Sequence, residues 1–404
     1  MNFGQDMYSP CSHAAIVSRQ LETNVNASDE LLDTEIQLQR LIKDIRSRNQ
    51  SVQPNTSQYV IPVVMHVFHD GNFGKMDMEQ ALSGLKILND DFNGLNDGWE
   101  TIDSEFDTIK GSLDITFCLA TIDPDGNPTT GLIYHEDENA VFNQGDLFQY
   151  AWDNYKYLNI YFPKYAFGSP SNFTAYAFYP STTEANNNTG GIFYSSIRWG
   201  YGNDSELAEG DDWASVCSHE AGHWLNLRHT FEGGCGNGDF VDDTPPTLGG
   251  GIELAGCYNN DNSCGVGTNG ENFMDYNHRC KKMFTQGQIH RMEAALYLPS
   301  RINLWSEQNL IETGCSNMIS SVSEIDLTDG ISIFPNPASN IITIRNSQAD
   351  YWLEIFTVDG RLVNRYFTQE AEIRIDVSNF NNGIYFVRTN DSSKIQTEKF
   401  VIDK

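Results

Sequence analysis

The residues best placed to do chemistry are two histidines and a glutamate in the segment SHEAGHWLNLRHTF, residues 218–231. His219 and His223 are four positions apart, so a helix projects both imidazoles from one face, where they can bind a single zinc ion. Glu220, beside the first histidine, is placed to take a proton from a water molecule that zinc activates. The spacing therefore predicts zinc-dependent hydrolysis with Glu220 as general base.

A third histidine, His229, lies six residues beyond His223. It can reach the same metal only if the helix ends and the chain turns between the two. Asn226 is the expected turn residue, because asparagine tolerates the left-handed conformation better than most non-glycine residues. The alternative is a chance pattern, which the third histidine makes a poor explanation.

These side chains need a helix to carry them and a sheet to support that helix. Apolar, strand-like runs occur at residues 59–68, 114–121, 157–162 and 190–199. Helices are expected at residues 77–94 and at residues 285–298, where T-Q-G-Q has the capping-box form. Strands interleaved with a long helix predict an α/β layer.

The chain is expected to have four parts. They are a partly helical propeptide, a catalytic domain, a linker and a small all-β module, at residues 1–56, 57–310, 311–328 and 329–404 respectively. A single helix is expected at about residues 28–48, and because it cannot form a core alone it must dock on something. Asp359-Gly360 and Asn382-Gly383 are candidate hairpin turns in the last module.

Charge and hydropathy exclude several classes of partner. The 404 residues contain 25 Lys and Arg against 55 Asp and Glu, a net charge of −30, which argues against nucleic acid as a partner. No apolar stretch approaches the length of a membrane span, so no transmembrane segment is expected. The first ten residues have neither a basic region nor an apolar run, so no signal peptide is expected in the sequence as given.

Four of the eight cysteines fall between residues 235 and 280, in a stretch rich in Gly, Asn and Asp. This clustering favours disulfides formed in an oxidising compartment. A structural zinc site is the alternative, but no CxxC pair supports it. The residues alone leave three pairings of these four cysteines open.

The histidine motif resembles the metzincin pattern HExxHxxGxxH, with Asn226 at the glycine position. In NFMDY, Met274 and Tyr276 follow His229 by about forty-five residues and resemble the methionine turn of that class. The resemblance implies that Met274 forms a hydrophobic floor beneath the zinc. It also implies that Tyr276 helps to stabilise the tetrahedral intermediate.

Further signatures are similar to those of the pappalysin family, in particular its ulilysin-like members. They are YVIPVVMHVF, LNDDFNGLN, YLNIYF, HEAGHWLNLRH, GDFVDDTPP, NFMDY and FTQGQ, which occur in the family's order across residues 57–300. The resemblance implies an α/β (α+β) metzincin domain with a mixed twisted sheet, an active-site helix and an irregular lower subdomain. It also implies two disulfides, Cys235–Cys264 and Cys257–Cys280.

The segment GDFVDDTPP has oxygen ligands that suit calcium. The residues alone leave an Asx-rich turn as an equal alternative, and the family resemblance favours calcium bound by Asp239, the carbonyl of Val241, Asp243 and Thr244. The stretch NHRC, with His278 and Arg279, departs from the pattern of the ulilysin-like members. Their preference for a basic residue just beyond the scissile bond is therefore not carried over to this chain.

The last module, with ISIFPNPASN, IFTVDGRLV and GIYFVR, resembles the C-terminal sorting domains of the bacterial type IX secretion system. The resemblance implies the type IX machinery as a partner, and a protein that is secreted or attached to the outer surface of a bacterium. A small carbohydrate- or surface-binding β-sandwich is the alternative.

Cys11, alone in the N-terminal segment, invites comparison with cysteine-switch propeptides. In that hypothesis its thiolate binds zinc in the latent form, at the position that three protein ligands leave open. The alternative is that Cys11 forms a disulfide with Cys118, Cys217 or Cys315, or stays a free thiol.

The sequence thus predicts a secreted zinc metalloendopeptidase, made as a zymogen, that acts on proteins and peptides. The competing hypothesis is a surface adhesin that binds zinc without catalysis. A zinc hydrolase acting on non-peptide substrates is a third possibility.

Overall fold

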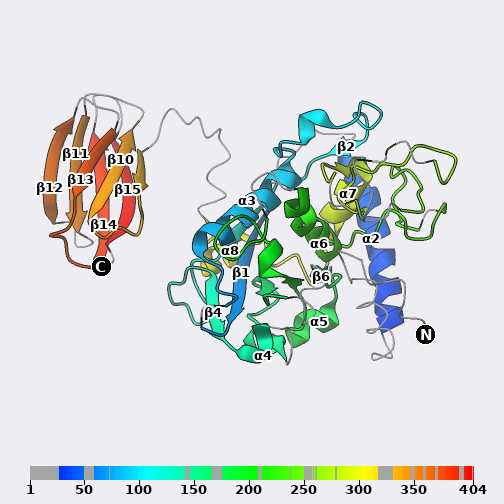
Figure 1. The fold of residues 1–404 in the computed structure, drawn as a ribbon, viewed down its shortest axis with the longest axis horizontal. Helices are drawn as coiled ribbons and strands as arrows, with labels where there is room; N and C mark the ends of the chain where they lie inside the picture. The colour runs from blue at the N-terminus through cyan, green and yellow to red at the C-terminus, as the bar shows by residue number, and fades with distance from the viewer. Residues whose placement is uncertain are drawn as a thin grey trace. The chain divides into compact units, whose positions relative to one another are not determined.

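The structure is a computed structural model of two compact units, Met1–Ser320 and Ser321–Lys404 (Figure 1). It describes residues 27–49, 59–316 and 331–404. Short gaps within these ranges fall at residues 72, 142–145, 166–174, 208–211, 237, 250–256, 258, 260–261, 278–279, 347–350, 358–360, 369–371, 391–394 and 403. No helix among the described residues is long and apolar enough to cross a membrane.

A six-stranded mixed sheet forms the centre of the first unit. Its main strand order is β3-β1-β5-β7-β6, and β4 extends the edge beside β1. The strands are β1 (Tyr59–His69), β3 (Ile115–Leu119), β4 (Leu132–Glu136), β5 (Leu158–Phe162), β6 (Ala175–Ala177) and β7 (Ile192–Tyr194). Every residue of β1 is buried, which explains its continuous apolar sequence, because a strand covered on both faces has no polar side. Only β6 pairs antiparallel with its neighbour.

Two helices, α3 (Met78–Asn93) and α6 (Val216–Trp224), contact each other and share the main apolar core with the sheet. Asp77 begins α3 by accepting a hydrogen bond from the Gln80 amide, and Gly94, at a φ of 67°, ends it in the left-handed conformation. Both ends agree with the sequence. The core places α6, which carries the histidine motif, directly on the sheet.

Shorter elements complete the unit. They are α4 (Glu138–Val141), α5 (Thr182–Asn187), α7 (Gln286–Leu296), α8 (Glu307–Thr313), the 3₁₀ turns η1 (Trp99–Thr101), η2 (Leu147–Tyr150), η3 (Ser196–Arg198) and η4 (Asp212–Ser215), and the paired strands β2 (Lys110–Gly111) and β8 (Phe284–Thr285). Between α6 and β8 the described residues form no helix or strand. Thr285 and Gln288 make the expected capping box at the start of α7.

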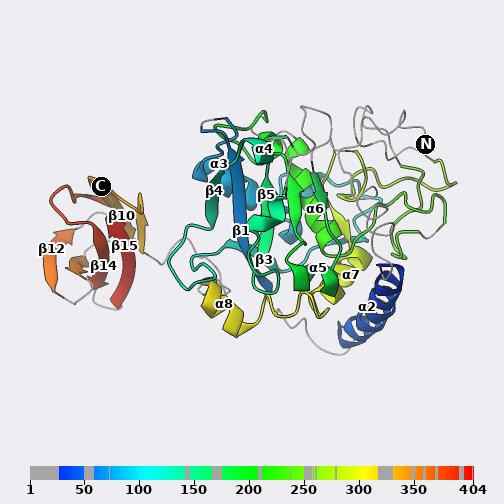
Figure 2. The same cartoon turned by 90° about the horizontal axis from the view of Figure 1, so that it is seen from below.

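The N-terminal helix α2 (Ala27–Asn49) packs against α7, as Figures 1 and 2 show from two directions. Its buried face consists of Leu38, Ile42 and Ile45, which form a cluster with Ala294, Ala295 and Leu298. The helix thus docks on the first unit, as its apolar stripe requires.

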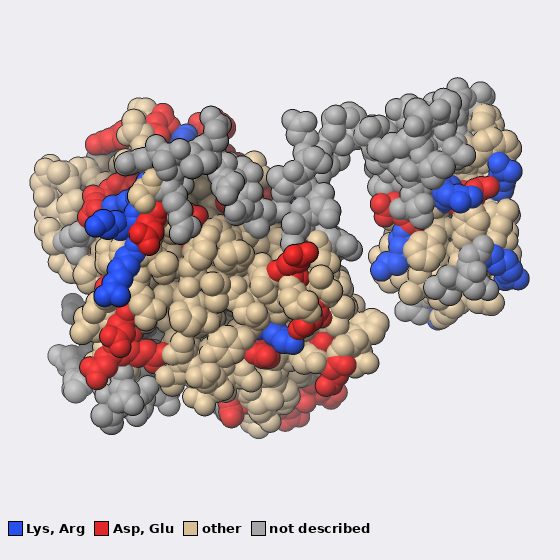
Figure 3. Space-filling model, turned by 180° about the vertical axis from the view of Figure 1, so that it is seen from behind, with Lys and Arg blue, Asp and Glu red and all other residues tan. Residues whose placement is uncertain are grey.

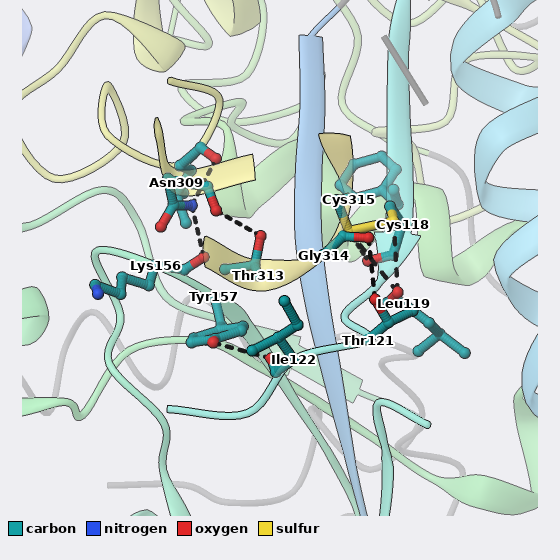
Figure 4. The surroundings of a disulfide bond; sticks show 12 residues. Cys118, Leu119, Thr121, Ile122, Lys156, Tyr157, Asn309, Thr313, Gly314 and Cys315 are labelled. Carbon is teal, nitrogen blue, oxygen red and sulfur yellow. Dashed lines mark hydrogen bonds between the residues drawn. A yellow bond between two sulfur atoms is a disulfide. The ribbon is translucent and has the colours of Figure 1, made fainter. Parts of the chain in front are cut away.

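The expected linker begins later than residue 311, because α8 runs to Thr313 and Gly314 ends it at a φ of 76°. Cys315 then forms a disulfide with Cys118 on β3, and the amide of Thr121 donates to the Thr313 carbonyl (Figure 4). The sequence alone does not reveal this pairing, because 197 residues separate the two cysteines. The first unit therefore extends at least to Cys315.

The second unit is a β-sandwich. One sheet has the order β13-β10-β9 and the other β12-β11-β14-β15, all antiparallel. The strands are β9 (Ile331–Phe334), β10 (Ile341–Asn346), β11 (Tyr351–Thr357), β12 (Leu362–Thr368), β13 (Glu372–Asp376), β14 (Gly383–Asn390) and β15 (Ile395–Ile402). Both sheets contribute to one apolar core, which includes Ile342, Leu353 and Val387.

The two turn predictions in this unit have different outcomes. Residues 358–360 lie outside the described part, but the flanking strands β11 and β12 pair as a hairpin requires. The hairpin expected at Asn382-Gly383 is wrong, because β13 and β14 belong to different sheets. Gly383 instead begins β14, where the chain passes from one sheet to the other.

Candidate active site

Helix α6 presents the first two histidines and then stops. All nine of its residues are buried. The amide of Asn226 donates to the His223 carbonyl, and that of Leu227 reaches back to the Gly222 carbonyl. Asn226 has a φ of 72°, the left-handed conformation expected of the turn residue. The chain can therefore bring His229 back towards the helix.

The three histidines converge through one ring nitrogen each. Nε2 of His223 lies 3.1 Å from Nε2 of His219 and 3.2 Å from Nε2 of His229, and all three residues are buried. Their ligand atoms lie within 4.8 Å of one another.

Carbonyl groups determine which nitrogen carries the proton. Nδ1 of His219 is 2.7 Å from the Phe273 oxygen, and Nδ1 of His223 is 2.7 Å from the Leu227 oxygen. A carbonyl can only accept, so in the neutral rings Nδ1 is protonated and Nε2 presents a lone pair. Lone pairs pointing at one another repel unless a cation lies between them. The arrangement fits a metal held by three imidazoles, a ligand set that suits zinc.

Met274 forms a floor against the histidine helix. It is fully buried, and a Cβ added to Gly222 would lie 2.5 Å from its Sδ, so any larger residue at that position of α6 would displace Met274. The Thr230 amide donates to the Met274 carbonyl at 3.3 Å, and its hydroxyl donates to Asp275 at 2.9 Å. These contacts join the methionine segment to the chain that follows His229.

Glu220 and two aromatic rings complete the group. Glu220 is fully buried on α6. The ring of Tyr276 is half-buried and its centroid lies 4.8 Å from that of His229 and 6.1 Å from that of His219. Phe231 stacks on His229 at 4.8 Å with an interplanar angle of 8°. Sequence reasoning missed Phe231, although an aromatic residue two positions after the third histidine was visible in the motif.

A buried acid behind α6 was also missed. Asp91 of α3 is 2% exposed, and its Oδ2 accepts a 2.6 Å hydrogen bond from the hydroxyl of Ser218, the residue before His219. Burial raises the pKa of Asp91 to about 7 even though the hydrogen bond from Ser218 acts to lower it. The sequence did contain a signal for this buried acid: Asp91 precedes Phe92 and falls on the apolar side of the helix predicted at residues 77–94.

The proposed calcium segment has two different aspartates. Asp239 is 5% exposed, and burial raises its pKa to about 6. Among the described residues, its Oδ2 and the buried hydroxyl of Thr244 make no hydrogen bond of standard geometry, although the hydroxyl is near enough to lower the pKa of Asp239. Both oxygens are thus available to a cation. Asp243 instead accepts hydrogen bonds from the Thr285 hydroxyl and the Gly287 amide, at 2.7 and 2.8 Å. It is therefore engaged at the start of α7.

Cysteine pairing leaves one buried thiol among the described residues. Cys235 pairs with Cys264 and Cys257 with Cys280, the pairings that the family resemblance implied. Cys118 and Cys315 pair with each other, so neither remains for Cys11, and Cys217 is buried as a free thiol. Cys11, His278 and Arg279 lie outside the described residues.

A mixed sheet that carries an HExxH helix, a left-handed turn, a third histidine and a methionine floor defines a metzincin-type metalloprotease domain. Residues 142–297 match the family described as pregnancy-associated plasma protein-A, and residues 332–403 match the secretion system C-terminal sorting domain. Residues 142–297 of the chain are therefore similar to the pappalysin family of metallopeptidases, and its C-terminal region is similar to a secretion sorting domain.

Curated relatives are extracellular metalloproteases. That of Coccidioides posadasii is 35% identical over 149 residues, which are 35% of this chain and 49% of the relative. That of Sordaria macrospora is 33% identical over 148 residues, which are 34% and 47% of the two chains. The match thus spans about half the length of these relatives.

Two solved structures from Tannerella forsythia share the fold. Mature mirolysin in complex with a cleaved peptide is 27% identical, with a TM-score of 0.54, and the match covers 64% of this chain and 98% of mirolysin. A promirolysin variant is 25% identical, with a TM-score of 0.59, and that match covers 74% of this chain and 98% of promirolysin. The match to the precursor form is the longer of the two.

Proposed function

We propose that this chain is the precursor of a secreted, zinc-dependent metalloendopeptidase that hydrolyses protein and peptide bonds. The observation that carries the proposal is the convergence of three Nε2 atoms, with the buried Glu220 on the same helix as two of these histidines. The extracellular metalloproteases among the relatives, and mirolysin with its cleaved peptide, support the same activity.

In this proposal His219, His223 and His229 hold zinc through Nε2, and the Phe273 and Leu227 carbonyls keep the first two rings in the required tautomer. When bound, zinc supplies a Lewis acid that polarises the scissile carbonyl and makes a water molecule more acidic. Glu220 takes the proton from the attacking water and delivers it to the leaving amine. The phenol of Tyr276 stabilises the negative charge that develops on the carbonyl oxygen.

A zinc-stabilised adhesin without catalysis remains the alternative class. Glu220 argues against it, because a structural site with three histidine ligands has no need of a buried carboxylate beside it. Turnover of casein by the mature enzyme separates the two classes. The proposal requires turnover that stops with a chelator and returns with zinc, whereas an inert protein with bound zinc would refute it. Cleavage of small esters without cleavage of casein would indicate the non-peptide hydrolase.

We also propose that residues 1–56 are the propeptide. The longer match to promirolysin than to mature mirolysin supports a precursor segment in this chain. In the latent enzyme, the thiolate of Cys11 takes the position left open by three histidine ligands. Residues 329–404 would then direct the protein to the type IX machinery, for release or attachment at the outer surface. The match to a sorting domain supports this role.

Calcium is proposed at the segment that contains Asp239. The carboxyl oxygen of Asp239 and the hydroxyl of Thr244 that make no hydrogen bond of standard geometry support the proposal, together with the Val241 carbonyl expected from the sequence. Asp243 contributes by holding this segment against α7.

A further inference from the structure

A buried arginine connects the N-terminal helix to the turn between the metal-binding histidines. Arg291 of α7 is 1% exposed. Its Nε donates to the carbonyl of Asn226 at 2.9 Å, and its Nη2 donates to the Oδ1 atom of the same residue at 2.5 Å. Nη1 and Nη2 also donate to the two carboxylate oxygens of Glu35 on α2, at 3.0 and 2.6 Å.

The turn that Arg291 holds is the one that brings His229 back to the other ligands. In the family pattern a glycine occupies its left-handed position, which an asparagine adopts at a greater conformational cost. In return, the side chain of Asn226 provides an oxygen that accepts from the guanidinium. The departure from glycine is therefore coupled to Arg291.

The ion pair between Arg291 and Glu35 is of a kind whose loss is strongly destabilising when only one of the two side chains is removed. It is bidentate, and the side chains are only 1% and 19% exposed. Removing one partner of a buried pair leaves the other charge without compensation. Among the described residues, Glu232 and Asp239 also lie near enough to interact with Arg291 electrostatically, but the hydrogen bonds of the guanidinium go to Glu35 and Asn226. When α2 is absent, Arg291 loses its carboxylate partner.

We propose that Glu35 is a positioning residue of the metal site: through Arg291 it stabilises the turn at Asn226, so the docked helix α2 slows the loss of zinc from the precursor. This inference rests on the proposed zinc site. It gives α2 a role separate from that of Cys11, since α2 acts on the turn through Arg291 and needs no contact with the metal. Once α2 leaves, the mature enzyme holds zinc less tightly than the precursor does.

The helix provides its own matched control at Glu30. Oε1 of Glu30 accepts from the Ser181 and Thr182 hydroxyls and from the Thr183 amide, at 2.7, 3.2 and 3.2 Å, so it anchors α2 at the start of α5. The hydrogen bonds of Arg291 to described residues go to Glu35 and Asn226, and not to Glu30. Glu30→Ala therefore weakens the docking of α2 without altering the contact to the turn.

The test uses the full chain with Glu220→Ala, so that the precursor cannot process itself. Zinc-loaded protein is mixed with excess chromophoric chelator, and the rate of zinc transfer is followed together with the melting temperature. Residues that orient metal ligands typically change metal affinity by about 10–100-fold. We expect Glu35→Ala to release zinc roughly tenfold faster, and Glu30→Ala to release it within about twofold of the parent. Glu35→Gln, which keeps an acceptor for Arg291 but not the charge, should lie between them.

Asn226→Gly identifies the route of the effect. Glycine keeps the left-handed turn and the main-chain carbonyl that Nε of Arg291 binds, but it removes the Oδ1 atom that Nη2 binds. In this background Glu35→Ala should therefore change zinc release by less than about threefold, a reduced effect that a double-mutant cycle requires of coupled residues. Equal zinc release by the parent and Glu35→Ala would overturn the inference, as would an undiminished effect in the Asn226→Gly background. A parent that retains no zinc would instead overturn the zinc site itself.

Discussion

The carboxyl of Glu220 is buried on the same short helix as two histidines, and its removal tests the proposed chemistry most directly. Glu220→Ala should retain zinc and the fold but lose proteolysis by a factor on the order of 10²–10⁴, because the general base is lost while the three ligands remain. Metal analysis and a fluorogenic peptide assay measure both properties. Peptide cleavage at a near-normal rate would show that another group takes the proton.

Asp239 allows the calcium proposal to be tested at one side chain. A ligand that binds only the folded state stabilises it, so calcium should raise the melting temperature relative to EGTA when zinc is kept saturating. Asp239→Asn should lose this shift. Asp242→Asn is the control, since that neighbouring side chain is 74% exposed and should leave the shift intact. Identical melting curves of the wild type in calcium and in EGTA would contradict the site.

His66 is a source of acid lability within the central sheet. Its Nε2 is 2.9 Å from the Asn159 oxygen and its Nδ1 is 3.1 Å from Nε2 of His135, so both of its nitrogens are engaged in the neutral form. Burial lowers the pKa of His66 to about 3 and that of His135 to about 4.

Because the unfolded chain takes up these protons near pH 6.5, the free energy of unfolding should fall as the pH drops from 6.5 towards 4. His66→Gln should show a shallower fall over this range in thermal melts, whatever its stability at pH 7.5. A wild-type melting temperature that stays constant between pH 6.5 and 4.5 would be evidence against this role.

At the scale of elements, the helices and strands were predictable where the signal is local. The four-residue spacing of His219 and His223, the Asp77 cap and the capping box at Thr285 depend on nearby residues, and the structure has all three. The pair of Arg291 and Glu35 could not be predicted, because 256 residues separate its members and each is an ordinary surface residue by sequence. Contacts of this kind depend on tertiary packing.

The N-terminal segment carries the prediction about latency. If the Cys11 thiolate occupies the metal site in the precursor, Cys11→Ser should release its propeptide sooner than the wild type when Glu220 is intact. Gel analysis of both precursors over time measures the rates. Equal rates, or a peptide map that places Cys11 in a disulfide of the intact precursor, would reject the switch.

At the scale of the whole molecule, charge is unevenly divided along the chain. Residues 331–404 contain eight Lys and Arg against nine Asp and Glu, so nearly all of the net charge of −30 lies in the residues before them. Figure 3 shows acidic side chains spread over the face of the larger unit that is in view. The acidic excess thus belongs to the part that carries the active site, and the sorting domain is close to neutral.

The two units have separate apolar cores, so the smaller unit should be dispensable for catalysis in solution. A chain truncated after Ser320 should keep casein turnover within about twofold of the full chain, since no residue of the site is removed. A chain truncated after Leu310 is the informative comparison. It lacks Cys315, and losing a native disulfide typically costs about 2–5 kcal/mol. Loss of casein turnover in the chain truncated after Ser320 would mean that the activity of the first unit depends on the second.

The disulfide at the end of α8 also determines how the first unit bears mechanical load. Cys315 is the last residue but one that the structure describes in this unit, so a pull on the C-terminal part of the chain is transmitted to the disulfide. Without the covalent bond, tension would peel α8 away one turn at a time. With it, the tension passes through Cys118 into β3, whose hydrogen bonds to β1 run along the full register from Tyr59 to Val63. These hydrogen bonds share the load, so a force applied at Cys315 is resisted by the pairing of β3 with β1 and does not have to be resisted by α8.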